Sequence, residues 1–338
     1  MNCKADFIMQ KCSILQHLPK AKLGYLPTPV IKLENLSRIL GGPDILMKRD
    51  DLTGLALGGN KTRKLEYILG DALKKGRDTV ITAGAQQSNH CRQTAAAAAK
   101  LGLECHLLLG GEQPVKLNGN LLLDELFGAH IHFTKENRKG EDIPNLVETL
   151  KLSGHKPYVI HYGGSNELGA CGFIEAGFEL ATQLDVKNLS HVFFASSSGG
   201  THAGLMIAKS LLKHNYELTG IQIDKAEGET ISFKHHVHKL VNSTSSFLNL
   251  QQNYAINEVL LDKGYLETGY GVLTEQEKEA IQLLAKSEGI LLDPVYTGRA
   301  FAAMVDKIQK RALPIDKQVL FWHTGGAPSL FAYSGAIL

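Results

Sequence analysis

Lys61 stands where an uncharged loop is predicted to pass into a helix. Residues 55–60 carry no charge, and Gly58 and Gly59 allow the backbone to turn tightly and another group to approach closely. After Lys61, apolar residues recur at helical spacing, at Leu65, Ile68, Leu69 and Ala72. Desolvation at such a position lowers the pKa of a lysine, and a neutral amine can attack a carbonyl and hold it as a Schiff base. The same residues also allow an ordinary loop lysine whose ammonium caps carbonyls or pairs with Asp50 or Asp51.

A loop of small residues at 196–201 (Ser-Ser-Ser-Gly-Gly-Thr) is a candidate anion site. It follows an apolar strand and opens a predicted helix, so its backbone N–H groups and the positive end of that helix could surround a phosphate. Thr201 could add a hydroxyl donor. The loop is neither a Walker loop nor a GxGxxG turn. A helix that starts with small residues and binds nothing is the alternative.

Two further loops occupy similar places, each between a predicted strand and a predicted helix. Polar residues at 86–90 could hold a carboxylate through backbone N–H groups and the Ser88 hydroxyl, although Ser88 could simply cap the helix. Residues 323–326 (His-Thr-Gly-Gly) could place a hydroxyl near an aromatic ligand, or could form a plain glycine turn. Because ligands of open α/β sheets bind at the carboxyl ends of strands, a ligand site is expected at these loops.

Two tyrosines flanked by turn residues could act as acid or base. Tyr270 lies between two glycines, and Tyr296 lies in residues 293–299, which we expect to form a turn between two apolar segments. A packing or interface role is the alternative for both, because lone tyrosines more often serve that purpose.

The elements that must position these residues alternate between strand and helix patterns. This alternation predicts an α/β fold with two open, twisted, mostly parallel sheets, the smaller inserted in the larger. Strands are expected at 45–48, 79–82, 105–109, 129–133, 157–161, 191–195, 218–223 and 318–322. Helices are expected at 62–75, 88–101, 118–127, 169–184, 201–212, 231–242 and 274–289, with a final helix opened by Gly325 and Gly326. Thr274 and Glu277 have the spacing of a capping box.

Composition excludes several other classes of protein. The chain has 338 residues, a formal net charge of +2 and no basic tract, which argues against a nucleic-acid partner. No segment approaches the ~20 apolar residues of a membrane span, and the first 20 residues do not read as a signal peptide. The five cysteines form no CxxC pair, as expected for reduced thiols in the cytoplasm. The 14 histidines form no HExxH and no zinc spacing with cysteine, so we expect no metal site.

Taken together, five segments between about residues 26 and 333 resemble the fold type II pyridoxal-phosphate enzymes, whose fold is that of tryptophan synthase β. The nearest branch holds 1-aminocyclopropane-1-carboxylate (ACC) deaminase and D-cysteine desulfhydrase. The segments are 48–51 (Lys-Arg-Asp-Asp), 59–64 (Gly-Asn-Lys-Thr-Arg-Lys), 87–90 (Gln-Ser-Asn-His), 198–201 (Ser-Gly-Gly-Thr) and 293–296 (Asp-Pro-Val-Tyr). The resemblance implies a larger cofactor-binding domain of residues 1–62 and 173–338, a smaller inserted domain of residues 63–172, and a homodimer.

The resemblance also implies how pyridoxal 5′-phosphate would be held. Lys61 would bind the cofactor aldehyde as a Schiff base, and Asn89 would hydrogen-bond the pyridoxal oxygen. Thr297 and Thr324 would face the pyridine nitrogen. The phosphate would be held by Ser197, Ser198, Gly199, Gly200 and Thr201.

A small amino acid would be the substrate, and the resemblance implies which residues contact it. Ser88 and the adjacent amides would take its carboxylate, with Asn89 and His90 beside it and Tyr270 and Tyr296 on its flanks. The catalytic residues would be Lys61, Ser88, Tyr270 and Tyr296, with either Lys61 or a tyrosine removing the α-proton.

Two departures from the deaminase pattern favour desulfhydrase activity. An ACC deaminase is expected to carry a glutamate directly after Asp-Pro-Val-Tyr, whereas this chain has Thr297. A hydroxyl leaves the cofactor a milder electron sink than a carboxylate does, which suffices to expel a thiolate. His90 replaces the glutamine of similar deaminases. We therefore expect β-elimination of D-cysteine to pyruvate, hydrogen sulfide and ammonia. ACC deamination, L-cysteate sulfo-lyase activity and a non-catalytic binder of a phosphorylated ligand are the alternatives.

Overall fold

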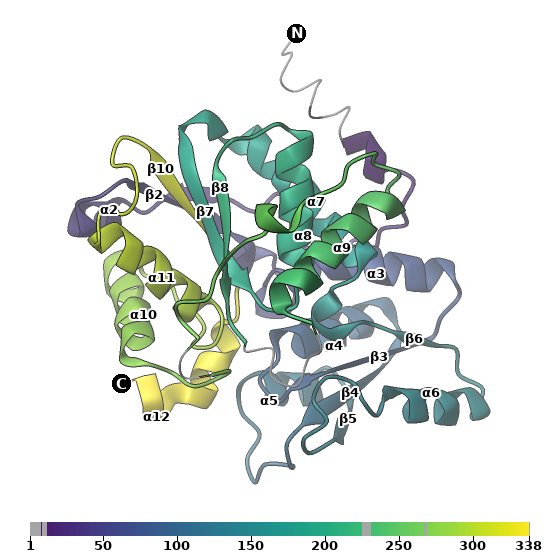
Figure 1. The fold of residues 1–338 in the computed structure, drawn as a ribbon. Coiled ribbons are helices and arrows are strands. Elements are labelled where there is room, and N and C mark those ends of the chain that lie inside the picture. Colours follow the sequence, from purple (N-terminus) through teal and green to yellow (C-terminus); the bar gives the residue numbers. More distant parts are fainter. Residues whose placement is uncertain (1–7, 9–11, 225–230, 267–268, 338) are drawn as a thin grey trace.

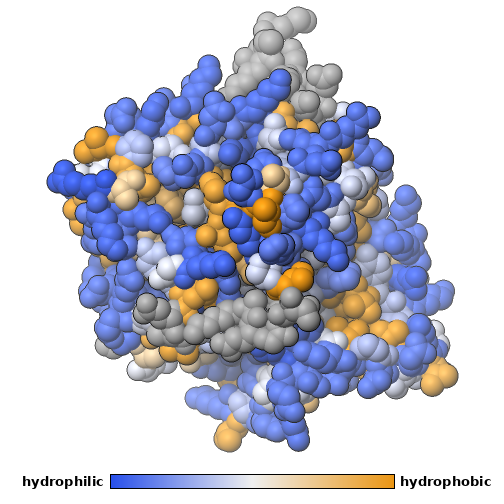
Figure 2. Space-filling view, in the orientation of Figure 1, coloured by the Kyte–Doolittle hydropathy of each residue, from blue (hydrophilic) through white to orange (hydrophobic). Residues whose placement is uncertain are grey.

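The computed structural model describes residues 8, 12–224, 231–266 and 269–337, and their strands form two separate sheets (Figure 1). One sheet has six strands and the other has four. The predicted α/β class with mostly parallel sheets is therefore confirmed. Hydrophilic residues cover most of the face seen in Figure 2, with apolar residues in small groups. None of the described helices is long and apolar enough to cross a membrane.

The six-stranded sheet has the order β1-β2-β10-β7-β8-β9, and only the edge strand β1 is antiparallel to its neighbour. Its strands are β1 (Val30–Lys32), β2 (Asp44–Arg49), β7 (Leu189–Ser196), β8 (Glu217–Gln222), β9 (Leu260–Asp262) and β10 (Gln318–His323). One face packs against α7 (Glu167–Gln183), α8 (Gly200–Leu211) and α9 (Phe233–Phe247). The other face packs against α2 (Glu34–Leu40), α10 (Glu275–Glu288) and α11 (Thr297–Gln309). In Figure 1 these two helical layers lie to the right and left of the sheet.

The four-stranded sheet lies in the lower part of Figure 1, has the order β5-β4-β3-β6 and is parallel throughout. Its strands are β3 (Thr79–Ala85), β4 (Glu104–Gly110), β5 (His130–Phe133) and β6 (Pro157–Val159). Helices α3 (Lys61–Lys74), α4 (Asn89–Leu101) and α5 (Gly119–Leu126) cover one face, and α6 (Ile143–Leu152) packs on the other. All four strands fall between β2 and β7 in the sequence. The domain boundaries after residues 62 and 172 stay predictions.

Several expected elements are confirmed with small shifts at their ends. Two helix starts were predicted accurately because each has a capping side chain. Ser88 caps α4 by accepting the N–H of Cys91, and Thr274 and Glu277 form the predicted capping box at the start of α10. The helix expected at 231–242 is α9, which runs on to Phe247. Of the five cysteines, Cys3 lies outside the described residues, and the four described ones are free.

Two expectations about secondary structure are wrong in part, and two helices were missed. The turn predicted at 293–299 covers only residues 294–296, because α11 begins at Thr297. The Asp293 carboxylate accepts the N–H groups of Val295, Tyr296 and Thr297 and so starts that helix. Helices α2 and α6 were not expected. After Gly326 the chain forms a 3-10 helix, η7 (Ala327–Tyr333), before the short α12 (Ser334–Ile337), instead of one regular helix. The other 3-10 turns are η1 (Ser13–Leu15), η2 (Asp50–Leu52), η3 (Leu55–Leu57), η4 (Tyr162–Gly164), η5 (Val186–Asn188) and η6 (Ile256–Glu258).

Candidate active site

One pocket gathers loops that leave the carboxyl ends of strands in both sheets. Ten predicted residues line it: Lys61, Ser88, Asn89, His90, Ser197, Ser198, Gly199, Thr201, Tyr296 and Thr324. Ser196 of the predicted loop 196–201 lines it too, and so do five residues that the sequence reasoning missed: Asn60, Tyr162, Gly163, Ala195 and His202. Gly200, Tyr270 and Thr297 were predicted but are not in its wall. The missed Tyr162 and Gly163 follow strand β6 in a Tyr-Gly-Gly-Ser segment, which is the same strand-then-glycine signal that identified the other loops.

Lys61 is the first residue of α3, at the place the sequence predicts. A side chain at Gly58 would put its Cβ 1.8 Å from the Asp51 carbonyl oxygen, and both Gly58 and Gly59 have positive φ, so this approach needs glycine. The Lys61 Nζ donates to the Gly163 carbonyl at 3.0 Å. Desolvation by burial is the main cause that lowers the pKa of Lys61 to about 8. Part of the Lys61 side chain is therefore present as the uncharged amine at neutral pH.

A second buried lysine, Lys64, lies one turn further along α3. Its Nζ is 3.2 Å from the Gly163 carbonyl oxygen and 3.1 Å from Ser165 Oγ. Burial first, and then the neighbouring Lys61, hold the pKa of Lys64 well below its ordinary value. Within the described residues, neither lysine has a carboxylate at ion-pair distance. Two amines without a carboxylate partner therefore lie at the pocket (Lys61) and beside it (Lys64). The expected alternative partners of Lys61 are taken, because Asp50 pairs with Arg63 and Asp51 pairs with Arg49.

The loop at 196–199 lies against Lys64 and opens α8. Gly199 has a φ of +87°, and a Cβ at Gly200 would lie 2.8 Å from Ser165 Oγ and 3.0 Å from Lys64 Nζ. The first amides of α8 have no carbonyl partner within the helix. Thr201 Oγ1 accepts from Asn60 Nδ2 at 3.2 Å, which joins this loop to the start of α3. Small residues, helix amides and an ammonium group thus converge where an anion was predicted.

His90 lines the pocket and has a ring nitrogen without a hydrogen-bond partner. Thr82 Oγ1 donates its one proton to the Ile160 carbonyl at 3.0 Å, so in its contact with His90 Nε2, at 2.9 Å, the ring nitrogen is the donor. The His90 Nδ1 therefore carries a lone pair, and it is buried without a hydrogen-bond partner. Burial, and secondarily the two lysines, keep the pKa of His90 well below its ordinary value. His90 is neutral and ready to accept a hydrogen bond.

Ser88 and Asn89 already have partners in their own neighbourhood. Ser88 Oγ caps α4, which is the plainer of the two alternatives for this residue, and it lines the pocket as well. Asn89 Oδ1 accepts from Asn120 Nδ2 at 2.9 Å. Their predicted contacts with a carboxylate and with the cofactor ring stay predictions.

Tyr296 lines the pocket, and Tyr270 contacts Tyr296 without lining the pocket itself. Their hydroxyl oxygens are 2.6 Å apart, and the rings are edge-to-face. The Arg138 guanidinium lies 4.8 Å from the centre of the Tyr270 ring and donates to Asp224 at 2.9 Å. Burial is the main cause that raises the pKa of both phenols. Both tyrosines are therefore protonated at neutral pH, so each can donate a hydrogen bond and neither is a ready base.

Thr297 points its hydroxyl toward Asp293. Its Oγ1 donates to Asp293 Oδ2 at 2.9 Å and accepts the Asp293 N–H at 2.7 Å. Burial raises the pKa of Asp293 although three N–H groups bind its carboxylate. The Thr324 carbonyl accepts the Asn60 N–H at 3.0 Å, and Thr324 does line the pocket. The predicted contacts of Thr297 and Thr324 with a ring nitrogen stay predictions.

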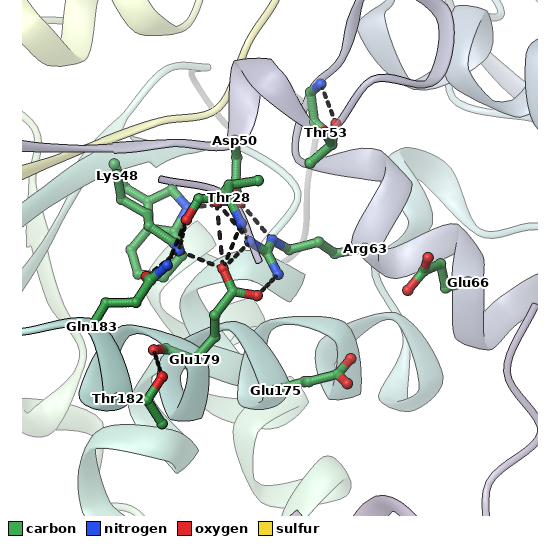
Figure 3. Close-up of polar contacts among 12 residues, drawn as sticks. Thr28, Lys48, Asp50, Thr53, Arg63, Glu66, Glu175, Glu179, Thr182 and Gln183 are labelled. Carbon is green, nitrogen blue, oxygen red and sulfur yellow. Dashed lines mark hydrogen bonds and ion pairs between the residues drawn. The ribbon is translucent and has the colours of Figure 1, made fainter. Parts of the chain in front are cut away.

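The opposite side of α3 is held by a cluster of buried charges, in which the side chains of Lys48, Asp50, Arg63 and Glu179 converge (Figure 3). Arg63 makes two hydrogen bonds to Asp50, at 2.8 and 2.9 Å, and two to Glu179, both at 2.9 Å. Lys48 donates to Glu179, to the Thr28 carbonyl and to Gln183. Trp322 donates to Asp50 at 2.8 Å. This cluster ties β2, α3, α7 and β10 together and so fixes the helix that carries Lys61.

Comparison with known proteins agrees with this geometry. A sequence model of the family described as "Pyridoxal-phosphate dependent enzyme" matches residues 21–325. A crystal structure of an ACC deaminase homologue is similar over 100% of this chain and 99% of its own, with 38% identity and a TM-score of 0.89. The processed form of threonine deaminase isoform 2 from Solanum lycopersicum shares the fold, with 16% identity, a TM-score of 0.68 and coverage of 98% of this chain and 88% of its own. A pyridoxal 5′-phosphate-dependent aspartate racemase does too, with 17% identity, a TM-score of 0.63 and 96% of both chains covered.

Proposed function

We propose that this chain, which belongs to the pyridoxal-phosphate dependent enzymes, converts D-cysteine and water to pyruvate, hydrogen sulfide and ammonia by β-elimination. Its cofactor is pyridoxal 5′-phosphate. One observation carries the choice of reaction: among the described residues that line the pocket, none has a carboxylate, and α11 begins at Thr297. Without a carboxylate at the pocket wall, a reaction with a good leaving group is favoured.

The residues of the pocket fit the cofactor. Lys61 is a half-buried amine with no carboxylate partner and would bind its aldehyde. The loop 197–199, the first amides of α8 and Lys64 would hold its phosphate, in a cradle that a Cβ at Gly200 would fill. Asn89 would contact the ring oxygen. Pyridoxal 5′-phosphate, when bound, withdraws electrons from the α-carbon of an amino-acid substrate.

Lys61 is the best candidate for the base that removes the α-proton. Its pKa of about 8 lets Nζ accept a proton near neutral pH. The raised pKa values of Tyr270 and Tyr296 leave the tyrosines protonated, so Tyr296 can donate a hydrogen bond to the departing group at the β-carbon. Thiolate needs little such help, because it is a stable anion. The acceptor at His90 Nδ1 is available for the substrate ammonium group or for Lys61.

ACC deamination is the second candidate, and the similarity to the ACC deaminase homologue supports it. It would release 2-oxobutyrate and ammonia. Opening an unactivated cyclopropane ring needs a stronger electron sink than the pocket residues indicate. L-Cysteate sulfo-lyase activity, with sulfite as the leaving group, is the third candidate, because Arg138 near Tyr270 adds a cation close to the pocket.

A side-by-side assay distinguishes these reactions. The holoprotein is given D-cysteine, L-cysteine, L-cysteate and ACC, and pyruvate, 2-oxobutyrate, sulfide and sulfite are each measured. We expect the highest kcat/KM with D-cysteine, with equal amounts of pyruvate and sulfide, and no turnover by Lys61→Ala. Release of 2-oxobutyrate from ACC, with D-cysteine inert, would replace the proposal by ACC deamination. No turnover of any substrate would favour a non-catalytic binder.

We further propose that the enzyme is a homodimer that acts in the cytoplasm. The four described cysteines are free thiols, three of them buried, as suits a reducing compartment. Light scattering of the purified holoprotein would give twice the chain mass for a dimer, and a monomer mass would contradict this part of the proposal.

A further inference from the structure

A cluster of histidines lies at the amino end of the four-stranded sheet, opposite the end that carries the pocket. Glu104 is the first residue of β4, and His130 is the first residue of β5. His106 is in register with His130 across these parallel strands. Because side chains alternate along a strand, Glu104 and His106 project from the same face of the sheet. The pocket residues at 88–90 instead follow the carboxyl end of β3, so the cluster and the pocket are separate.

The ligand atoms of Glu104, His106 and His130 all lie within 4.8 Å of one another. Glu104 Oε1 is 2.8 Å from His106 Nε2 and 3.4 Å from His130 Nε2. Around a tetrahedral zinc ion with bonds of about 2.0–2.2 Å, neighbouring ligand atoms are ~3.3–3.5 Å apart. The Glu104–His130 distance already fits this range, whereas Glu104 Oε1 and His106 Nε2 must move slightly apart, which the 32% exposed side chain of Glu104 allows.

The surroundings of His106 match those of a metal-binding imidazole. Its Nδ1 is 3.0 Å from His132 Nε2, so with Nε2 on a metal the proton on Nδ1 would be donated to His132. The rings of His130 and His132 both stack on His106. His155 Nδ1, 3.5 Å from Glu104 Oε2, could approach as a further ligand.

We propose that Glu104, His106 and His130 bind a divalent transition-metal ion of the zinc type, with His132 orienting His106. Two imidazole nitrogens and one carboxylate oxygen favour Zn²⁺, Co²⁺ or Ni²⁺ over Mg²⁺ and Ca²⁺, which prefer oxygen ligands. The ion would join the edge strand β5 to β4. The proposal does not depend on which substrate the pocket binds.

Equilibrium dialysis of the untagged holoprotein against micromolar Zn²⁺, followed by metal analysis, tests the site. We expect one zinc ion per chain, with binding at least about tenfold weaker in His106→Gln and in His130→Gln. His132→Leu should weaken binding by roughly 10- to 100-fold, because it removes only the partner of His106. The matched control is His17→Gln, at an exposed histidine outside the cluster, which should bind zinc as the natural chain does.

Two further measurements make the result decisive. Thermal unfolding without metal shows whether each variant is folded, and His130→Gln should be, because its side chain is mostly exposed. The near-visible spectrum of the holoprotein should not change as zinc is added, which separates this site from metal bound at the cofactor. The proposal is overturned if the natural chain binds no zinc, or if the double variant His106→Gln/His130→Gln binds it undiminished.

Discussion

The two sides of helix α3 bury positive charge in opposite ways. On one side Arg63 is surrounded by Asp50 and Glu179, and these carboxylates raise its pKa despite the cost of burial. On the other side Lys61 and Lys64 have a carbonyl and a hydroxyl as partners, and burial lowers the pKa of both. Arg63, which is paired with carboxylates, fixes the helix. Lys61 and Lys64 have no carboxylate partner and so are available for an aldehyde and an anion.

Helix α3 therefore carries both a stabilising cluster, around Arg63, and a candidate reactive residue, Lys61. A buried charge without a counter-ion lowers the stability of the fold. Removing one partner of a buried ion pair leaves such a charge behind, so the pairs around Arg63 should be sensitive to substitution. The Arg63 cluster can therefore hold the poorly solvated start of α3 in place. Variants on the two sides should behave differently, and the largest difference is expected at Lys61.

Replacing Lys61 with alanine should lower turnover by about 10³-fold or more and remove the near-visible absorbance of the bound cofactor. The proposed cause is loss of the amine that would bind the aldehyde and accept the proton. Spectra and pyruvate release measure both effects. Lys75→Ala, at the other end of the same helix, is the control and should change neither. A Lys61→Ala protein that keeps its absorbance would end the assignment of Lys61.

Replacing Glu179 with alanine should lower the free energy of unfolding by about 3–5 kcal/mol, because Arg63 and Lys48 lose a buried counter-ion. Urea unfolding measures it. Glu175, one turn earlier on α7, pairs at the surface with Lys20, so Glu175→Ala should cost under about 1 kcal/mol. Equal losses in the two variants would contradict the idea that the Arg63 side fixes the helix.

The pH dependence of stability should differ between the cofactor-free protein and its Lys61→Met variant. With a folded pKa of about 8 against ~10.4 in the unfolded chain, Lys61 binds more protons when unfolded over this interval. Its contribution to stability therefore rises as pH increases from 8 to 10.4, by roughly 3 kcal/mol, and is constant below 8. The variant should be the more stable near pH 7, and the gap should close by about pH 10. A gap that does not change with pH would mean that Lys61 is solvated.

Replacing Lys64 with methionine should weaken binding of pyridoxal 5′-phosphate by roughly 10- to 100-fold, because a charge-assisted contact of about 1.5–3 kcal/mol is lost. Binding of pyridoxal, which has no phosphate, should be unchanged and provides the internal control. Titration of the cofactor-free protein followed by absorbance measures both affinities. Equal weakening for the two aldehydes would place Lys64 away from the phosphate.

Local patterns predicted much of the fold and part of the pocket. The strand–loop–helix order, the capping box at Thr274 and the position of Lys61 at a helix start were readable, because each depends on hydrogen bonds and periodicity within a few residues. The start of α11 was missed, since its signal is one buried side chain, Asp293, that accepts three N–H groups. The partners of Lys64 were missed because Gly163 and Ser165 lie about a hundred residues away in the chain.

By itself, the sequence determined the fold class, the family and the amine at the centre of the pocket, all of which rest on short-range patterns. Tertiary structure alone decided which buried cations have counter-ions and which do not. It also brought Glu104, His106 and His130 together, although no linear spacing indicated a metal site. The physical reason is that the register between β4 and β5 and the packing of α3 against α7 come from contacts between distant segments, and these contacts set the charge and solvation around each side chain.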